Sequence, residues 1–587
     1  MIETVKNNTS DKGKLPDYQL PETVVEVLRG SRILGSGETP QDMLGRVVKT
    51  IFKIETKFNT PYEQINKLKL QLAQSMVDQS MSPGSPTLTN AGRLEHESSA
   101  LTSCVLIPAD LTKRTEAAEK IKAYWRQNMS SGFDLTPYKD PVGLLVWLNQ
   151  LAAQETATGL YERYIGNMAT LNVAHPKINE FIEAKRQKDL PHVNISVDVT
   201  DELMETAIAA QNDQLTNDSA VKASELLRKI AENAWHNGDP GIIYLERMNK
   251  DNPVAVISPY INIPPCAEMG LAWGETCQFG YINLAKFTTA EGIDDDRLKE
   301  IVYLLTRVLD NGVELNLGRY PDFESTKIAR LKRKIGISVC GLADLLLIHD
   351  LPYDSEEARQ LARDVLAFIN YHSKRASVRL AEERGPCGAM EEDENQYLSG
   401  KFLEEKYASQ ATRTVSSKDW IDLADHIRQT GQLRNILTTA LPPSGRTSIL
   451  LGASASIEPI FGVTDQRGEV NPAVADFVCR HTDGSDFQKI LDQAVVEGTF
   501  QNTPLSTQAR ACLKTAKEIS SKDQVEMVAV LAGLNGVFDE SASKTVNLPS
   551  EAVVDDVLQI FISAHCLGLK NISVYRDGSK ANQPNRL

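Results

Sequence analysis

Apolar and polar residues follow two different periodicities along this chain, and each periodicity predicts a different kind of element. From Thr39 the run TPQDMLGRVVKTIFKIETKF spaces its apolar residues as a helix does, with Thr39 as a candidate N-cap and Pro40 in the first helical position. Helical spacing continues over residues 64–81, so residues 39–82 are predicted to form a helical N-terminal region. Residues 1–38 are predicted to be a flexible arm.

Further along the chain, short apolar runs alternate with longer amphipathic ones. HVNISVDVT (192–200) precedes DELMETAIAAQ (201–211), and KIGISVCGL (334–342) precedes a helical pattern over residues 356–384. Strand-like runs separated by helices indicate parallel strands with crossover connections. The pattern therefore predicts an α/β fold, as a sheet or a barrel, built by residues 83–587 as one large domain.

Composition and charge narrow the classes of function. The 587 residues carry a formal net charge of −15, which argues against nucleic acid as a partner, because neutralising phosphates needs clustered Lys and Arg. Residues 1–19 lack the apolar core of a signal peptide, and no run reaches the roughly 18 apolar residues that span a bilayer. These features predict a cytoplasmic protein without a membrane partner.

The eight cysteines form no C-x-x-C pair, so neither a zinc ribbon nor a standard iron–sulfur ligand set is predicted, and no metal site is assigned. The segment NIPPCAEMGLAWGETCQFGYINLAKF (262–287) is rich in glycine and proline, which predicts a loop. Within it, Cys266 and Glu268 lie two residues apart. In an extended backbone both side chains would project to the same side and could engage adjacent atoms of one substrate.

Longer words around this segment carry a resemblance to a known family. They are GSPTLTNAGRLEHESSALTSCVLI (84–107), RYIGNMATLNVAHPKINEFIEAKR (163–186), AWHNGDPGIIYLERMNKDNP (234–253), KIGISVCGLADLL (334–346) and LRNILTTALPPSGRTSILLGASASIEPIFG (433–462). In this order they resemble the large catalytic component of ribonucleotide reductases over most of the chain. The resemblance implies a ten-stranded α/β barrel with a central finger loop.

The same resemblance implies a role for each residue of the site. Cys266 would stand at the tip of the finger loop and carry a transient thiyl radical, which abstracts a hydrogen atom from ribose C3′ in a pocket that excludes water. Glu268 would accept the 3′-hydroxyl proton, and Cys104 and Cys277 would supply the reducing equivalents and close as a disulfide. The substrate would be bound by Ser103 and by the phosphate loop PSGRTS, which consists of Pro443, Ser444, Gly445, Arg446, Thr447 and Ser448. The other interpretation of PSGRTS is an ordinary turn before an apolar ILLG strand.

The C-terminal word GLKNISVYRDGSK (568–580) bears on the source of the radical. In family members that take the radical from a diiron subunit, two adjacent tyrosines relay it, and the corresponding positions here are Ser573 and Val574. A Ser–Val pair cannot relay a radical at tyrosine-like potentials. This word and GNMATL (166–171) resemble the adenosylcobalamin-dependent class, which implies adenosylcobalamin as the cofactor.

Three features depart from the family pattern. The active-site word is usually N-x-C-x-E, but Pro264 stands two residues before Cys266 and offers neither an amide side chain nor a backbone N–H, which leaves Asn262 as a candidate replacement. No cysteine pair follows Cys566 to pass electrons to the active-site disulfide, so the expected reductant is a thioredoxin-like or other external dithiol. Arg446 is unusual in a phosphate loop, and could clamp a di- or triphosphate or point to solvent.

The leading prediction is an adenosylcobalamin-dependent enzyme that reduces ribonucleoside di- or triphosphates to 2′-deoxyribonucleotides. A homodimer is one assembly that this prediction allows. One alternative is a diverged enzyme that keeps the radical step but performs a non-reductive transformation of a nucleotide. The other alternative is a non-catalytic paralogue that binds nucleotide. Retention of Cys104, Cys266 and Cys277 argues against this last reading, because a non-catalytic paralogue has no chemical need for them.

Overall fold

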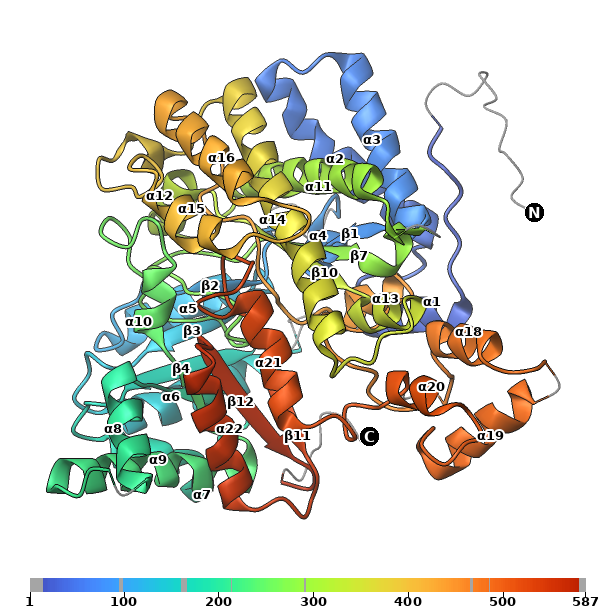
Figure 1. The fold of residues 1–587 in the computed structure, drawn as a ribbon. Coiled ribbons are helices and arrows are strands. Elements are labelled where there is room, and N and C mark those ends of the chain that lie inside the picture. The colour runs from blue at the N-terminus through green and yellow to red at the C-terminus, as the bar shows by residue number, and fades with distance from the viewer. Residues whose placement is uncertain are drawn as a thin grey trace.

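The fold is a mixed α/β arrangement in which two groups of strands are surrounded by helices (Figure 1). The computed structural model describes residues 14–93, 99–159, 166–212, 214–289, 292–464, 468–484 and 486–579. The predicted α/β class is confirmed, and so are the strand at HVNISVDVT and the helix at 356–384.

The N-terminal part is helical, and α2, η1 and α3 lie within the range 39–82 that was predicted to be helical. Its elements are α1 (Glu22–Gly30), α2 (Pro40–Lys53), the 3-10 turn η1 (Ile54–Phe58) and α3 (Tyr62–Val77). Thr39 caps α2, because its side chain accepts a hydrogen bond from the Asp42 N–H while the Asp42 carboxylate accepts one from the Thr39 N–H. The boundary of this region as a separate domain stays a prediction.

Helix α1 lies inside the predicted flexible arm, and that prediction is wrong for this part of the arm. Val25 and Leu28, three residues apart on one face, are buried, and so are Ile33 and Leu34 just after the helix. The apolar spacing is present in the sequence, but it extends over too few residues to stand out from a polar surrounding. Residues 1–13 of the arm lie outside the described residues.

Seven strands form the larger sheet, in the order β11-β12-β6-β5-β4-β3-β2. Strands β2 to β6 run parallel to one another, β12 is antiparallel to β6, and β11 is parallel to β12. Their bounds are β2 Cys104–Leu106, β3 Ser130–Asp134, β4 Asn167–Asn172, β5 Asn194–Asp198, β6 Gly241–Ile243, β11 Thr545–Leu548 and β12 Asn571–Arg576.

The smaller sheet has the order β1-β7-β10, with β1 antiparallel and β10 parallel to the central strand. These strands span β1 Met81–Pro83, β7 Phe279–Asn283 and β10 Gly336–Cys340, and a short hairpin is formed by β8 Thr288–Thr289 and β9 Gly292–Ile293. Isolated backbone bridges join β2 to the segment before β7 (Val105 with Thr276) and β10 to a segment that in turn pairs just before β11 (Ile337 with Thr439, and Leu441 with Ala542). Closure of the strands into the expected ten-stranded barrel stays a prediction.

Helices connect the strands and cover the sheets. Between α3 and residue 262 they are α4 Ser85–Asn90, α5 Arg114–Trp125, α6 Pro141–Ala157, α7 Ile178–Gln187, α8 Asp201–Gln211, α9 Asp218–Asn237 and α10 Leu245–Lys250. Those after it are α11 Asp295–Asn316, α12 Phe323–Lys332, α13 Leu342–Ile348, α14 Glu356–Arg384, α15 Lys401–Lys406, α16 Ser417–Thr430, α17 Gly445–Leu450, α18 Pro472–Arg480, α19 Phe487–Glu497, α20 Thr507–Cys512, α21 Ser521–Ala532 and α22 Val554–Cys566. Short 3-10 turns are η3 Leu284–Phe287, η4 Gly388–Glu391 and η5 Ala408–Gln410.

One predicted element has the wrong type. The apolar run ILLG (449–452), interpreted as a strand in the alternative reading of the phosphate loop, continues helix α17 and ends in a turn. A short apolar run is compatible with either a strand or a buried helix segment, and here Leu450 packs into the core while Ile449 faces outward.

Candidate active site

Residues 262–271 form a narrow loop, called the finger loop below, whose two arms are hydrogen-bonded at the base. The Leu271 N–H donates to the Asn262 carbonyl (2.7 Å), and the Ile261 N–H donates to the Leu271 carbonyl (2.8 Å). At the tip, the Ala267 N–H donates to the Pro264 carbonyl (2.9 Å) to close a turn. The loop predicted over residues 262–287 is confirmed up to residue 278 and is wrong beyond it, because Phe279–Asn283 form β7 and Leu284–Phe287 form η3.

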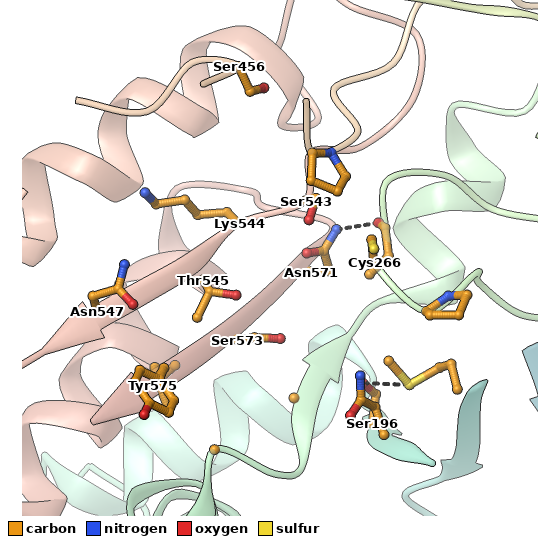
Figure 2. A pocket seen from close by; sticks show the side chains of 18 of the residues that line it. Ser196, Cys266, Ser456, Ser543, Lys544, Thr545, Asn547, Asn571, Ser573 and Tyr575 are labelled. Atoms are coloured by element: carbon orange, nitrogen blue, oxygen red, sulfur yellow. Dashed lines mark hydrogen bonds between the residues drawn. The ribbon is translucent and has the colours of Figure 1, made fainter. Parts of the chain in front are cut away.

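A glycine on β3 makes room for this loop. A Cβ atom on Gly132 would lie 2.3 Å from the Ile263 carbonyl oxygen, so the approach of the finger loop to the sheet requires glycine there. At the other side of the tip, the Asn571 side-chain amide donates to the Ala267 carbonyl (2.8 Å), as Figure 2 shows. The tip is therefore anchored to β12.

Cys266 is exposed and lines a cavity of about 530 Å³. In Figure 2 it lies beside Asn571 at one end of this cavity, while Asn547 and Tyr575 lie at the other end. The walls between them carry hydroxyl and amide side chains, including those of Asn194, Ser196, Thr545 and Ser573. The cavity falls within the range of 300–1,000 Å³ that is usual for small-molecule sites.

A buried group, which we call the redox trio, is formed by Glu268 of the finger loop together with Cys104 and Cys277. One ligand atom of each, the two sulfurs and a carboxylate oxygen, lies within 4.8 Å of the others. The two cysteines are brought together by strand pairing, since the Cys277 N–H donates to the Cys104 carbonyl (3.2 Å). Burial raises the pKa of the Cys277 thiol well above its ordinary value, and its hydrogen bond with Cys104 raises it further, so Cys277 is a neutral thiol.

The expectation that Cys266 and Glu268 project to one side assumed an extended backbone. The backbone is not extended there, because Ala267 between them is left-handed, with φ of 58°. Cys266 consequently lines the cavity, whereas Glu268 is only 2% exposed and does not line it. The geometry pairs Glu268 with the two other cysteines, and the catalytic roles of all four residues stay predictions.

The phosphate loop divides between two surroundings. Pro443, Ser444 and Gly445 line the cavity of Cys266, and the Ser444 hydroxyl accepts a hydrogen bond from the Ser456 N–H (2.7 Å). The remaining three residues do not line it: Thr447 and Ser448 are buried, and Arg446 borders a separate small recess beside α4. Ser103 also lies outside the cavity wall, and its N–H donates to the Cys277 carbonyl (3.1 Å).

Asn262, the candidate replacement for the missing asparagine, lies at the base of the finger loop. It is fully buried, and its side-chain oxygen accepts hydrogen bonds from the Thr170 hydroxyl (3.0 Å) and the Ile263 N–H (2.7 Å). The amide therefore orients the start of the loop, and the tip has no asparagine from within the loop.

Sequence reasoning missed several residues of the site. Asn571 holds the tip, and Lys544 lines the cavity while ion-paired with Glu458 in the same wall. The signal for Asn571 is weak, since it is one polar residue at the start of an apolar strand in the word GLKNISV. As for metals, the redox trio offers two thiol sulfurs and a carboxylate, which are donors that a thiophilic cation accepts.

Residues 208–575 match the family model described as ribonucleotide reductase, barrel domain. The chain belongs to the ribonucleotide reductase family. It is 30% identical to a vitamin B12-dependent ribonucleoside-diphosphate reductase of Thermoplasma acidophilum, over 97% of this chain and 73% of that protein. A protein of Mycobacterium tuberculosis (strain CDC 1551 / Oshkosh) with the same description is 32% identical, over 85% of this chain and 71% of its own.

A solved structure shares the fold. The class Id ribonucleotide reductase alpha subunit of Actinobacillus ureae superposes with a TM-score of 0.74 at 17% sequence identity, covering 96% of this chain and 99% of that one. Among the described residues, none of the helices combines the length and apolar character needed to cross a bilayer.

Proposed function

We propose that this chain reduces ribonucleotides to 2′-deoxyribonucleotides through a thiyl radical on Cys266. The observation that carries the proposal is the redox trio, in which two thiols and a carboxylate lie within 4.8 Å of one another behind a loop whose tip presents a third thiol. Membership of the reductase family supports the same reading. The two relatives named above are described as ribonucleoside-diphosphate reductases, so a diphosphate is the first substrate to test.

The residues divide the reaction between them. The Cys266 sulfur radical takes the hydrogen atom from ribose C3′, and Glu268 accepts the 3′-hydroxyl proton as the 2′-hydroxyl leaves as water. Cys104 and Cys277 supply two electrons and two protons and close as a disulfide; one proton leaves with the 2′-hydroxyl in the water and the other is added at C2′. Glu268 returns its proton to the 3′ oxygen, and Cys266 returns the hydrogen atom to C3′. Ribose C2′ is reduced, two thiols are oxidised, and water is released. Ser444 and Gly445 would hold the phosphates at the cavity wall.

Adenosylcobalamin is the proposed cofactor, because the curated relatives are described as vitamin B12-dependent. The cavity wall fits its adenosyl part: the phenol oxygen of Tyr575 is buried with no hydrogen-bond partner among the described residues, and Asn194, Ser196 and Ser573 add polar groups. These four side chains would hold the adenosyl ribose and base. When bound, the cofactor supplies the one-electron oxidant that converts the Cys266 thiol to a thiyl radical.

Regeneration needs a reductant that reaches the disulfide, and we propose a thioredoxin-like or other external dithiol. Assembly as a homodimer and a cytoplasmic location stay predictions.

The test is product formation. The full chain is incubated with adenosylcobalamin, dithiothreitol and each ribonucleoside di- or triphosphate, and products are separated by chromatography. We expect deoxynucleotide that depends on the cofactor. Free base or another non-reduced product would favour the diverged enzyme, and unchanged nucleotide in every mixture would contradict the proposal.

A further inference from the structure

A cluster of buried charges lies against the return arm of the finger loop and lines no part of the cavity. It consists of Lys332, Lys334, Glu275 and Glu540, with Tyr260 between them. We propose that Lys334 and Glu540, together called the Gly270 clamp below, are positioning residues that fix the return arm of the finger loop and tie it to the segment that carries Cys277. This inference rests on the proposed function.

The clamp holds both polar groups of one residue. Lys334 Nζ donates to the Gly270 carbonyl (2.6 Å), and the Glu540 carboxylate accepts from the Gly270 N–H (3.2 Å). The two clamping side chains are ion-paired with each other at 3.2 Å. The N–H and the carbonyl of Gly270 are thus bound by two side chains of opposite charge. Gly270 lies two residues after Glu268 in the sequence.

Tyr260 contacts both residues of the clamp. Its hydroxyl donates to the Glu540 carboxylate (2.6 Å), and Lys334 Nζ lies 4.5 Å from the centre of its ring. A Cβ atom on Gly270 would lie 2.1 Å from a ring carbon of Tyr260. The position therefore requires glycine, and the ring prevents the arm from shifting toward it.

Lys334 also contacts the segment that leads to Cys277. Its Nζ lies 3.1 Å from Glu275, whose carboxylate also accepts from Lys332 Nζ (3.0 Å) and from the Ala272 N–H (2.8 Å). Glu275 precedes Cys277 by two residues. One ammonium group thereby links the arm that carries Glu268 to the segment that carries Cys277.

The cluster is costly to bury, which is a reason to look for a function. Lys332, Lys334, Glu275 and Glu540 have side chains only 2–3% exposed. Apolar residues of similar volume often stabilise a core as well as or better than buried ion pairs do. The benefit that remains is a single defined position for the loop.

The charges also act on the thiol pair. Burial, Cys104 and the negative charge of Glu268 raise the pKa of Cys277, whereas the positive charge of Lys334 lowers it. Burial lowers the pKa of Lys334, but the negative charges of Glu275 and Glu540 outweigh burial and raise it, so this lysine stays protonated. Within the clamp, Lys334 therefore contributes the positive charge that partly offsets the raised pKa of Cys277.

Three variants test the clamp against a matched control. Lys334→Met removes the ammonium, Glu540→Gln keeps the shape without the charge, and Lys334→Arg restores a cation. Lys406→Met is the control, because Lys406 is also a buried lysine, and in the part of the chain that the structure describes it contacts Asp251 and the Asp539 carbonyl instead of the finger loop. For each variant, kcat and KM for deoxynucleotide formation are measured, and so is the thermal unfolding temperature.

We expect Lys334→Met to lower kcat about 100-fold with KM nearly unchanged, because a misplacement of about 1 Å at reacting groups has an effect of that size. Glu540→Gln should lower kcat about tenfold, and Lys334→Arg should recover most of the activity. Lys406→Met should lose unfolding temperature as Lys334→Met does, while keeping kcat within about threefold. Equal kcat in Lys334→Met, Glu540→Gln and Lys406→Met would overturn the proposal.

A second readout does not depend on turnover. Hydrogen–deuterium exchange of a peptide covering residues 262–272 reports opening of the finger loop directly. Lys334→Met and Glu540→Gln should speed exchange of this peptide over wild type, and Lys406→Met should not. Wild-type exchange in both clamp variants would overturn the clamp even if the chain reduces ribonucleotides. Faster exchange in a chain that forms no deoxynucleotide would support the clamp while the proposed function fails.

Discussion

The two faces of the finger loop offer opposite surroundings to the groups they carry. The tip presents Cys266, exposed, to a cavity walled by hydroxyl and amide side chains. The return arm carries Glu268 into a buried site with Cys104 and Cys277, next to the Gly270 clamp. One turn with a left-handed Ala267 separates them.

This difference teaches how one loop can serve two chemistries. The residue proposed to become a radical has to be reached by the cofactor and by the ribose, so it needs an open face. The thiols proposed to give up electrons have to be kept from stray oxidants. Both are buried, and for Cys277 burial also raises the thiol pKa, which keeps that thiol protonated. The predictions below, from the largest expected effect to the smallest, break one face or the other.

Cys266→Ser breaks the open face and has the largest expected effect. Serine cannot form a radical at thiyl potentials, so deoxynucleotide formation should fall to the background of the assay. Nucleotide binding, measured by calorimetry, should stay within about threefold of wild type, because only one sulfur atom changes. Measurable turnover in this variant would remove Cys266 from the chemistry.

Cys104→Ser or Cys277→Ser breaks the buried face. Radical formation at the tip should persist, whereas multiple turnover should stop because no disulfide can close. Rapid quenching separates the two, since it detects the radical before turnover. The two faces would not be separable if either variant also abolished the radical.

Glu268→Gln keeps the shape of the buried face but removes the base. General-base catalysis contributes roughly 10²- to 10⁴-fold, so kcat should fall within that range while KM changes little. The control is Glu458→Gln, which changes a carboxylate in the cavity wall without touching the redox trio. Equal losses in both variants would argue that charge in general, and not a base at Glu268, is what the reaction needs.

The smallest effect is a difference in labelling. In the reduced protein at pH 8, iodoacetamide should modify Cys266 while Cys277 stays unlabelled, because the thiolate is the nucleophile and burial raises the Cys277 pKa. Raising the pH to 9 should leave Cys277 protected, and unfolding in urea should expose it. Mass spectrometry of the peptides measures both. Equal labelling of the two cysteines in the folded protein would contradict the contrast between the faces.

The sequence was sufficient for elements that depend on local periodicity. The helix predicted over residues 356–384 matches α14, and the strand in KIGISVCGL matches β10, because both patterns lie within one continuous segment. Helix α1 and the helical ILLG run were missed, since short apolar runs do not distinguish a strand from a buried helix.

The site was predictable only in part, and for physical reasons. The resemblance pointed to Cys104 and Cys277, and strand pairing does bring them together. The separation of Cys266 from Glu268 was not predictable, because a left-handed alanine leaves no mark in the sequence. Lys334, Glu540 and Asn571 are far from the finger loop in the sequence, so their contacts with it arise only from the fold.

The most direct test of the central claim is the location of the radical. The chain is produced with cysteine deuterated at its β-carbon, mixed with adenosylcobalamin and a ribonucleoside diphosphate, and freeze-quenched for electron paramagnetic resonance. A radical on Cys266 predicts a signal that narrows with the deuterated cysteine and is lost in Cys266→Ser. A signal whose width does not change with the deuterated cysteine, or a signal that persists in Cys266→Ser, would contradict the account.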